Sequence, residues 1–216
     1  MAAFAAALAR FRFCRGAVPF CHDVDQYDGG GVGVHCFGGG GSGYDIGRDA
    51  LEAALRAFDG RGEPTRLTDL LATRLGGGVN TRITEIYREG KPYIAACAPA
   101  VFEAAERGDG VAESILLRNA RKLAEYMETA WAHLTRGTSA LPEAFPVVMG
   151  GSISQKADGW PALVASLVDA DIPVRVTVAA MPPVFGAVVE ARKQTADGEG
   201  ADFTAIRTAF SHSFSL

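Results

Sequence analysis

The sequence predicts an α/β domain that is rich in helices and has a small, mainly parallel sheet. Amphipathic helical patterns follow one another from Gly47 to Arg136, with apolar side chains on one face and charged ones on the other. Beyond them lie two short runs that are typical of buried strands, Phe145–Met149 and Val174–Ala179. A helical pattern at Trp160–Leu167 separates these runs, and this order indicates a βαβ unit with parallel strands.

Residues 1–37 differ in character from the rest of the chain. Apart from a short helical pattern at Ala2–Phe11, neither a helical nor a strand period emerges there. No cationic residue precedes the apolar run at the N-terminus, which argues against a signal peptide. We expect residues 1–37 to be an atypical segment, either disordered or mis-translated from a shifted frame or a wrong start. Residues 38–216 are then expected to form the folded domain.

Periodicity predicts the helices of this domain one by one. The first is expected from Gly47 to Phe58, and two glycines and a proline after it end the pattern. Asp109 stands at the N-cap position of the longest helix, Gly110–Arg136, where its carboxylate can accept hydrogen bonds from free backbone N–H groups. Between them, helices are predicted at residues 65–75, 81–88 and 94–107.

The C-terminal part contains the two predicted strands and one further helix. The run Phe145–Met149 is continuously apolar, whereas Val174–Ala179 alternates and is rich in β-branched residues. A turn at Met181–Gly186 is expected to lead into a helix at Ala187–Lys193. No element is predicted after Asp197.

Composition excludes several classes of function. Of the 216 residues 48% are hydrophobic and 21% charged, and the formal net charge is −4. A nucleic-acid partner is not expected, because the sequence contains no dense basic stripe. A membrane span is not expected either, because no stretch approaches the roughly 18 apolar residues that one requires.

The cysteines and histidines do not predict a metal site. Cys14 and the pair Cys21–His22 could contribute ligands, but no second pair completes a tetrahedral set. The four cysteines show no paired spacing, so we interpret them as free thiols of a cytoplasmic protein.

A glycine-rich loop precedes the first helix and is the first candidate binding site. It consists of Gly38, Gly39, Gly40, Gly41 and Ser42. Glycines let the backbone approach a ligand closely, and a helix N-terminus just beyond presents free N–H groups. The pattern therefore predicts an anion-friendly corner of the size of a sugar or a phosphate. A flexible linker is the alternative, because linkers also contain consecutive glycines.

A second candidate site follows the first predicted strand. Gly150, Gly151 and Ser152 end the run Phe145–Met149. Ligands of open α/β sheets bind beyond the carboxyl ends of the strands, and two glycines there would let a planar base lie against the backbone. A plain turn between a strand and a helix is the alternative.

Four ordered segments resemble one known family. The segment from Gly38, GGGGSGYDIGR, is similar to the GDEGSGYWIGR loop of the N-acetylglucosamine kinase and BadF/BadG/BcrA/BcrD-type ATPase family. The segments FEAAERGD from Phe102 and PVFGAVVEA from Pro183 are similar to two of its helical segments. Gly150 and Gly151 resemble the adenosine-binding turn of sugar kinases, actin and heat-shock ATPases.

The resemblance implies a fold, a reaction and two ligands. The fold would be the C-terminal lobe of a ribonuclease-H-like, actin-like ATPase. The reaction would be phosphoryl transfer from ATP, with Mg²⁺, to an amino-sugar hydroxyl. Gly150, Gly151 and Ser152 would then bind adenosine, and the loop Gly38–Ser42 would contact the sugar.

The chain also departs from the family pattern. Gly39 and Gly40 stand where the family has Asp-Glu, and that aspartate holds sugar hydroxyls in sugar-kinase relatives. Near Asp28, Val32 replaces the threonine of the family's DGGGTKT phosphate loop. In the family that loop and the catalytic aspartate belong to an N-terminal lobe, so we expect no catalytic residue in this chain and no activity from it alone.

Three hypotheses follow for the chain as a whole. In the first hypothesis it is a truncated sugar-kinase-like enzyme that lacks its N-terminal lobe. Alternatively it is a non-catalytic nucleotide-binding or regulatory half, or an ATPase activator, that pairs with another chain or with itself. In the third hypothesis it is an unrelated helical α/β domain.

Overall fold

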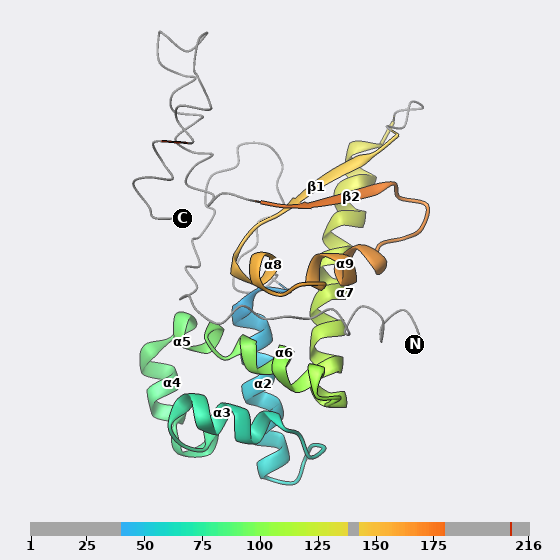
Figure 1. Cartoon of the computed structure of the whole chain (residues 1–216). Helices are drawn as coiled ribbons and strands as arrows, with labels where there is room; N and C mark the ends of the chain where they lie inside the picture. Colours follow the sequence, from blue (N-terminus) through green and yellow to red (C-terminus); the bar gives the residue numbers. More distant parts are fainter. Residues whose placement is uncertain (1–39, 138–142, 180–207, 209–216) are drawn as a thin grey trace. The chain divides into compact units, whose positions relative to one another are not determined.

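The computed structural model describes residues 40–137, 143–179 and Thr208 (Figure 1). The chain divides into two compact units, Met1–Val178 and Ala179–Leu216, and the elements below belong to the first. Several predictions lie outside the described residues: the short helix at Ala2–Phe11, the metal candidates Cys14 and Cys21–His22, Gly38, Gly39, and the turn and helix from Met181 to Lys193.

Helices make up most of the described part, and a small sheet follows them (Figure 1). In chain order the elements are α2 (Gly43–Phe58), α3 (Leu67–Leu75), the 3₁₀ turn η1 (Val79–Thr81), α4 (Ile83–Glu89), α5 (Lys91–Ala95), α6 (Ala98–Glu106), α7 (Gly110–Leu134), β1 (Phe145–Met149), α8 (Ser152–Lys156), α9 (Trp160–Ser166) and β2 (Val174–Val178).

The two strands pair in parallel, which confirms the predicted strand, helix, strand unit. Phe145 pairs with Val174 and Met149 with Val178. The sheet packs on the long helix, because the ring of Phe145 lies 5.4 Å from that of Trp131 on α7. α9 lies between the strands in sequence and buries Trp160 against Phe102 of α6 in an edge-to-face contact of 5.7 Å.

The helical core forms where α2, α3, α6 and α7 pack together. Its fully buried side chains include Ile46, Leu71, Phe102, Ile115 and Leu116. The apolar periodicity of α2 and α7 predicted this face, since residues spaced three and four apart share one side of a helix.

Most predicted ends lie within two residues of the observed ones, but three differences are larger. α2 begins at Gly43 instead of Gly47, because Ser42 caps it one turn earlier. The single helix predicted at 94–107 is two helices, since α5 ends at Ala95 and α6 starts at Ala98 with Pro99 in its first turn, where a missing N–H costs nothing. The short helix α8 was not predicted, because five residues are too few to show a period.

Asp109 caps α7, as predicted, and also joins it to the segment before α3. Its Oδ1 accepts a hydrogen bond from the N–H of Ala112 at 2.9 Å. Its Oδ2 accepts bonds from the Thr65 hydroxyl at 2.9 Å and from the Arg66 N–H at 2.6 Å. The carboxylate is only 8% exposed, so these donors replace the water it has lost.

Cys97, a free thiol at the start of α6, is expected to be chemically inert while the chain is folded. It is 2% exposed, and burial raises the pKa of its thiol from 9.0 to about 11. We therefore expect no reaction of Cys97 with iodoacetamide at pH 8 in the native chain and rapid reaction in urea, as measured by peptide mass spectrometry. Because the folded-state pKa is raised, this thiol stabilises the fold below pH 9, and that contribution declines between pH 9 and 11. Equal rates of iodoacetamide reaction in the native and the denatured chain would contradict the buried position of Cys97.

Candidate functional site

The turn after β1 presents open backbone. Gly150 follows the last residue of the strand, and Gly151 precedes the first residue of α8 with φ +89°. Both glycines are exposed, and a Cβ built on either would meet no atom of the described residues within 4 Å. Space for a flat ligand therefore exists in front of this backbone, at the carboxyl end of the strand where ligands of α/β sheets bind.

The glycine loop, of which Gly40, Gly41 and Ser42 are described, packs tightly on α7. Both glycines are buried. The Gly40 N–H donates to the Tyr126 hydroxyl at 3.2 Å, and the Gly41 N–H donates to Oδ1 of Asn119 at 3.1 Å. These residues therefore belong to the packed structure, which excludes the linker alternative for this part of the loop.

Side chains at Gly40 or Gly41 would collide with α7. A Cβ on Gly40 would lie 2.2 Å from Cδ of Lys122, and a Cβ on Gly41 would lie 2.4 Å from Cγ of Leu123. Gly41 also has φ +81°, which residues other than glycine rarely adopt. The glycines thus permit close contact between the loop and a helix.

The N-terminus of α2 already holds a negative charge. The Ser42 Oγ accepts from the Asp45 N–H at 3.1 Å and donates to the Asp45 carboxylate at 2.5 Å. Arg48 lies 3.4 Å from the same carboxylate, which is 7% exposed. A carboxylate paired with an arginine therefore already compensates the helix dipole here. The anion-friendly corner stays a prediction.

The structure brings the two predicted sites close together. A Cβ on Gly43, directly after the glycine loop, would lie 3.7 Å from Cγ1 of Ile153. Ile153 follows Ser152, the last residue of the second candidate site. Segments that lie more than 100 residues apart in the sequence therefore meet where α2 and α8 begin.

Two residues that hold the loop were missed from the sequence, Asn119 and Tyr126. Asn119 is fully buried among the apolar residues of α7, and its amide meets the loop. A polar residue within the apolar stripe of an amphipathic helix is a signal that could have been followed, because a buried amide needs partners.

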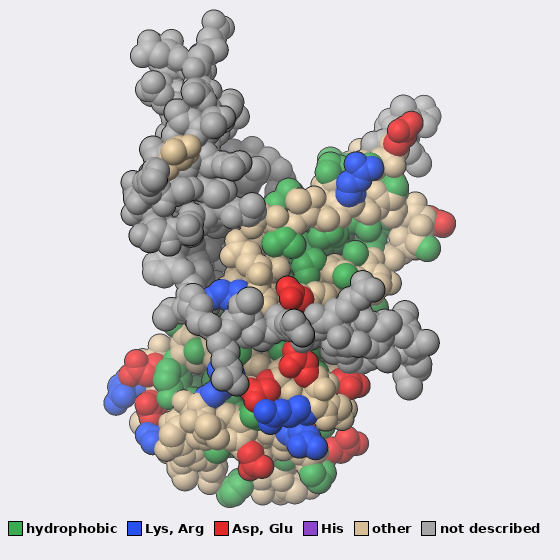
Figure 2. All heavy atoms as spheres, in the orientation of Figure 1, with side chains coloured by type: hydrophobic (Ala, Val, Ile, Leu, Met, Phe, Trp, Pro, Cys, Tyr) green, Lys and Arg blue, Asp and Glu red, His purple; other side chains and the backbone are tan. Residues whose placement is uncertain are grey.

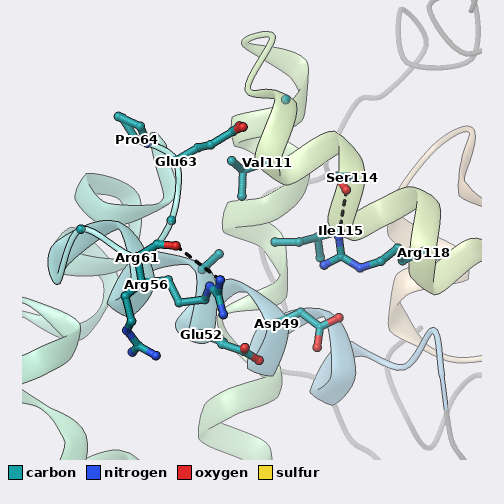
Figure 3. A pocket seen from close by; sticks show the side chains of 14 residues that line it. Asp49, Glu52, Arg56, Arg61, Glu63, Pro64, Val111, Ser114, Ile115 and Arg118 are labelled. Atoms are coloured by element: carbon teal, nitrogen blue, oxygen red, sulfur yellow. Dashed lines mark hydrogen bonds between the residues drawn. The ribbon is translucent and has the colours of Figure 1, made fainter.

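A shallow groove of about 940 Å³ runs between α2 and the first turns of α7 (Figure 3). Charged side chains of both signs line it, among them Asp49, Glu52, Arg56, Glu63 and Arg118. Figure 3 shows Arg118 turned to the Ser114 hydroxyl and Arg56 turned to the backbone of Arg61, and these are hydrogen bonds of 2.8 and 3.4 Å. Glycines 150 and 151 do not line this groove.

The surface charges are mixed beyond the groove as well. Acidic and basic side chains are interspersed over the helical part of the face in Figure 2, while hydrophobic side chains gather over β1 and β2.

Within residues 40–137 and 143–179, His, Cys, Asp and Glu do not form a group of three that could hold a metal ion. None of the helices described for this chain has both the length and the apolar character needed to cross a bilayer.

Comparisons with known proteins extend these observations. A model of the BadF/BadG/BcrA/BcrD ATPase family matches residues 23–191. An N-acetylmuramic acid/N-acetylglucosamine kinase of Clostridium acetobutylicum is 44% identical over 97 residues. That alignment covers 44% of this chain and 31% of the kinase, so the chain matches about a third of its relative's length.

Proposed function

The chain belongs to the BadF/BadG/BcrA/BcrD ATPase family, and on that premise we propose that it supplies the C-terminal lobe of an ATP-dependent kinase of the N-acetylglucosamine kinase type. In such an enzyme a phosphoryl group passes from ATP to a hydroxyl of an amino sugar. Membership in the family argues against the hypothesis of an unrelated helical domain. The identity shared with an amino-sugar kinase supports this substrate class.

One observation carries the proposal: the glycine loop and the turn at Gly150 lie next to each other. The short distance of 3.7 Å from a Cβ built on Gly43 to Cγ1 of Ile153 supports a shared site in which one bound pair of substrates contacts both loops. The open backbone at Gly150 and Gly151 suits adenosine, and the charge-compensated start of α2 suits a sugar. These properties support two binding sites: Gly150, Gly151 and Ser152 bind the nucleotide, and the glycine loop contacts the sugar.

We propose that the described residues serve substrate binding and not phosphoryl transfer. Transfer needs a phosphate clamp, Mg²⁺ and a carboxylate that orients the attacking hydroxyl. The buried carboxylate of Asp45 already accepts a hydrogen bond from the Ser42 hydroxyl and forms an ion pair with Arg48. In the described residues no acidic cluster suited to a metal is found. We therefore assign the clamp and the catalytic carboxylate to a second lobe or chain and expect no turnover from this chain alone.

The free, buried thiol of Cys97 supports a reducing compartment, and we place the protein in the cytoplasm. The second candidate function is that of a non-catalytic nucleotide-binding half. A nucleotide could bind at the open turn at Gly150 without any sugar being bound to the chain.

Replacing Gly150 by valine is expected to weaken nucleotide binding without destabilising the fold. The Cβ of the new side chain meets no atom within 4 Å in the part of the chain that the structure describes, and the side chain would occupy the proposed position of the base. Isothermal calorimetry of the full chain with MgATP should show binding, with affinity reduced at least tenfold by Gly150→Val, an increase in free energy of about 1.4 kcal/mol.

The matched control is Gly110→Val, which fills an equally open position at the start of α7. It should leave MgATP affinity unchanged, and both variants should keep the melting temperature of the parent chain. No heat and no thermal shift with millimolar MgATP would reject the nucleotide site. Binding of MgATP without binding of N-acetylglucosamine would favour the non-catalytic half.

A further inference from the structure

Asn119 is a buried amide with a partner for each of its polar atoms. Its side chain is inaccessible to solvent. Oδ1 accepts from the Gly41 N–H at 3.1 Å, while Nδ2 donates to Oδ2 of Asp49 and to the Ile115 carbonyl, both at 3.0 Å. An unpaired buried amide costs free energy, so the three hydrogen bonds favour the one arrangement of loop and helices in which all of them form.

The orientation of this amide depends on Asp49. The two ends of an asparagine amide have nearly the same shape, so the bonding partners decide which end points where. Two acceptors, Asp49 and the Ile115 carbonyl, face the NH₂ end, and one donor faces the oxygen. Turning the amide over would set NH₂ against the Gly41 N–H and oxygen against two oxygens, and all three bonds would be lost.

The same amide joins three parts of the fold. Gly41 lies in the glycine loop, Asp49 lies on α2, and Asn119 lies on α7. The Gly40 N–H adds a second bond, to Tyr126, which lies two helical turns further along the same face of α7. Since Ser42 follows Gly41 directly and caps α2, the position of the end of the loop that joins α2 depends on these bonds.

We propose that Asn119 is a positioning residue for the sugar: it sets the glycine loop against α7, and the Asp49 carboxylate holds its amide in the orientation that the loop requires. This rests on the proposed function, in which the glycine loop contacts an amino sugar. Asn119 is buried beneath the loop and acts through Gly41 without touching the substrate. The structure therefore assigns part of the sugar affinity to a pair of residues outside the loop.

The test measures the loop and the sugar separately. Amide hydrogen exchange, followed by NMR on the full chain, reports the bond at the Gly41 N–H. Asn119→Ala should speed exchange there at least tenfold relative to amides of the α2 core, such as that of Ala50. Val164→Ala, which removes buried side-chain volume from α9, is the control for general loss of stability and should leave the Gly41 rate unchanged relative to Ala50.

Exchanging the two side chains is the decisive variant. Asn119→Asp alone sets two carboxylates against each other and should lose protection at Gly41. Combined with Asp49→Asn, the new amide donates to the new carboxylate, whose other oxygen still accepts from Gly41. Most of the protection should therefore return, even though the Ile115 carbonyl loses its side-chain donor. If Asn119→Ala does not fold, Asp49→Ala at the edge of the groove provides the same measurement with a smaller effect.

Calorimetric titration with N-acetylglucosamine provides the functional arm. Asn119→Ala should weaken sugar binding about fivefold or more and the double exchange should restore it, while MgATP affinity stays unchanged. Unaltered exchange at Gly41 in Asn119→Ala, or a double exchange no better than Asn119→Asp, would overturn the positioning role. If the parent chain binds no sugar, the proposed substrate is wrong, and the exchange rates alone decide whether Asn119 positions the loop.

Discussion

Replacing Gly47 by alanine is expected to destabilise the folded chain by about 3 kcal/mol, although the same change inside an exposed helix stabilises by up to about 1 kcal/mol. A Cβ at Gly47 would lie 2.0 Å from the carbonyl oxygen of Ile94 and 2.9 Å from its carbonyl carbon. These are backbone atoms, so no rotamer change can relieve the contact. α2 and α5 would have to separate, which would also disturb the core around Ile46.

Gly43→Ala is the matched control, because Gly43 lies one turn earlier in the same helix. Its Cβ would find its nearest neighbours, in α5 and α8, at 3.7–3.8 Å, which is ordinary van der Waals distance. We expect Gly43→Ala to be neutral or slightly stabilising. Urea unfolding followed by circular dichroism measures both variants. Equal free energies of unfolding for the two would show that α2 and α5 do not approach each other as described.

Replacing Asp109 by alanine is expected to cost about 3 kcal/mol. Loss of an N-cap alone costs about 1 kcal/mol. The substitution also leaves the Thr65 hydroxyl and the Arg66 N–H without their acceptor, and hydrogen bonds to a charged group contribute about 1.5–3 kcal/mol. α7 would lose its cap and its connection to the segment before α3 at the same time.

Asp109→Asn separates the two roles. Asparagine caps helices as well as aspartate does, so the bond from Ala112 should remain while the charge-assisted bonds are weakened. We expect about half the effect of Asp109→Ala in urea unfolding. Asp59→Ala removes a carboxylate from an exposed pair with Arg61 and should leave the unfolding midpoint unchanged. If Asp109→Ala were as mild as Asp59→Ala, the connection between α3 and α7 would be refuted.

Local patterns predicted most elements but not all their ends. The apolar periods of α2, α3 and α7 and the β-branched run of β2 are local properties of the chain, and the structure confirms these elements. The break before Ala98 was missed because Pro99 suits the first turn of a new helix, while the flanking apolar residues continue the period. α8 was missed because it is shorter than two helical turns.

The sequence by itself determined the long helices, the cap at Asp109, the parallel strand pair and the likeness to a family of ATPases. It could not assign the glycines their roles. Only the tertiary structure separates Gly47, which another backbone touches, from Gly150, which faces open space, and Gly41, whose N–H meets a buried amide. The physical reason is distance: helical periods and caps depend on neighbours within a few residues, whereas these roles depend on atoms of segments distant in the sequence that only packing brings into contact.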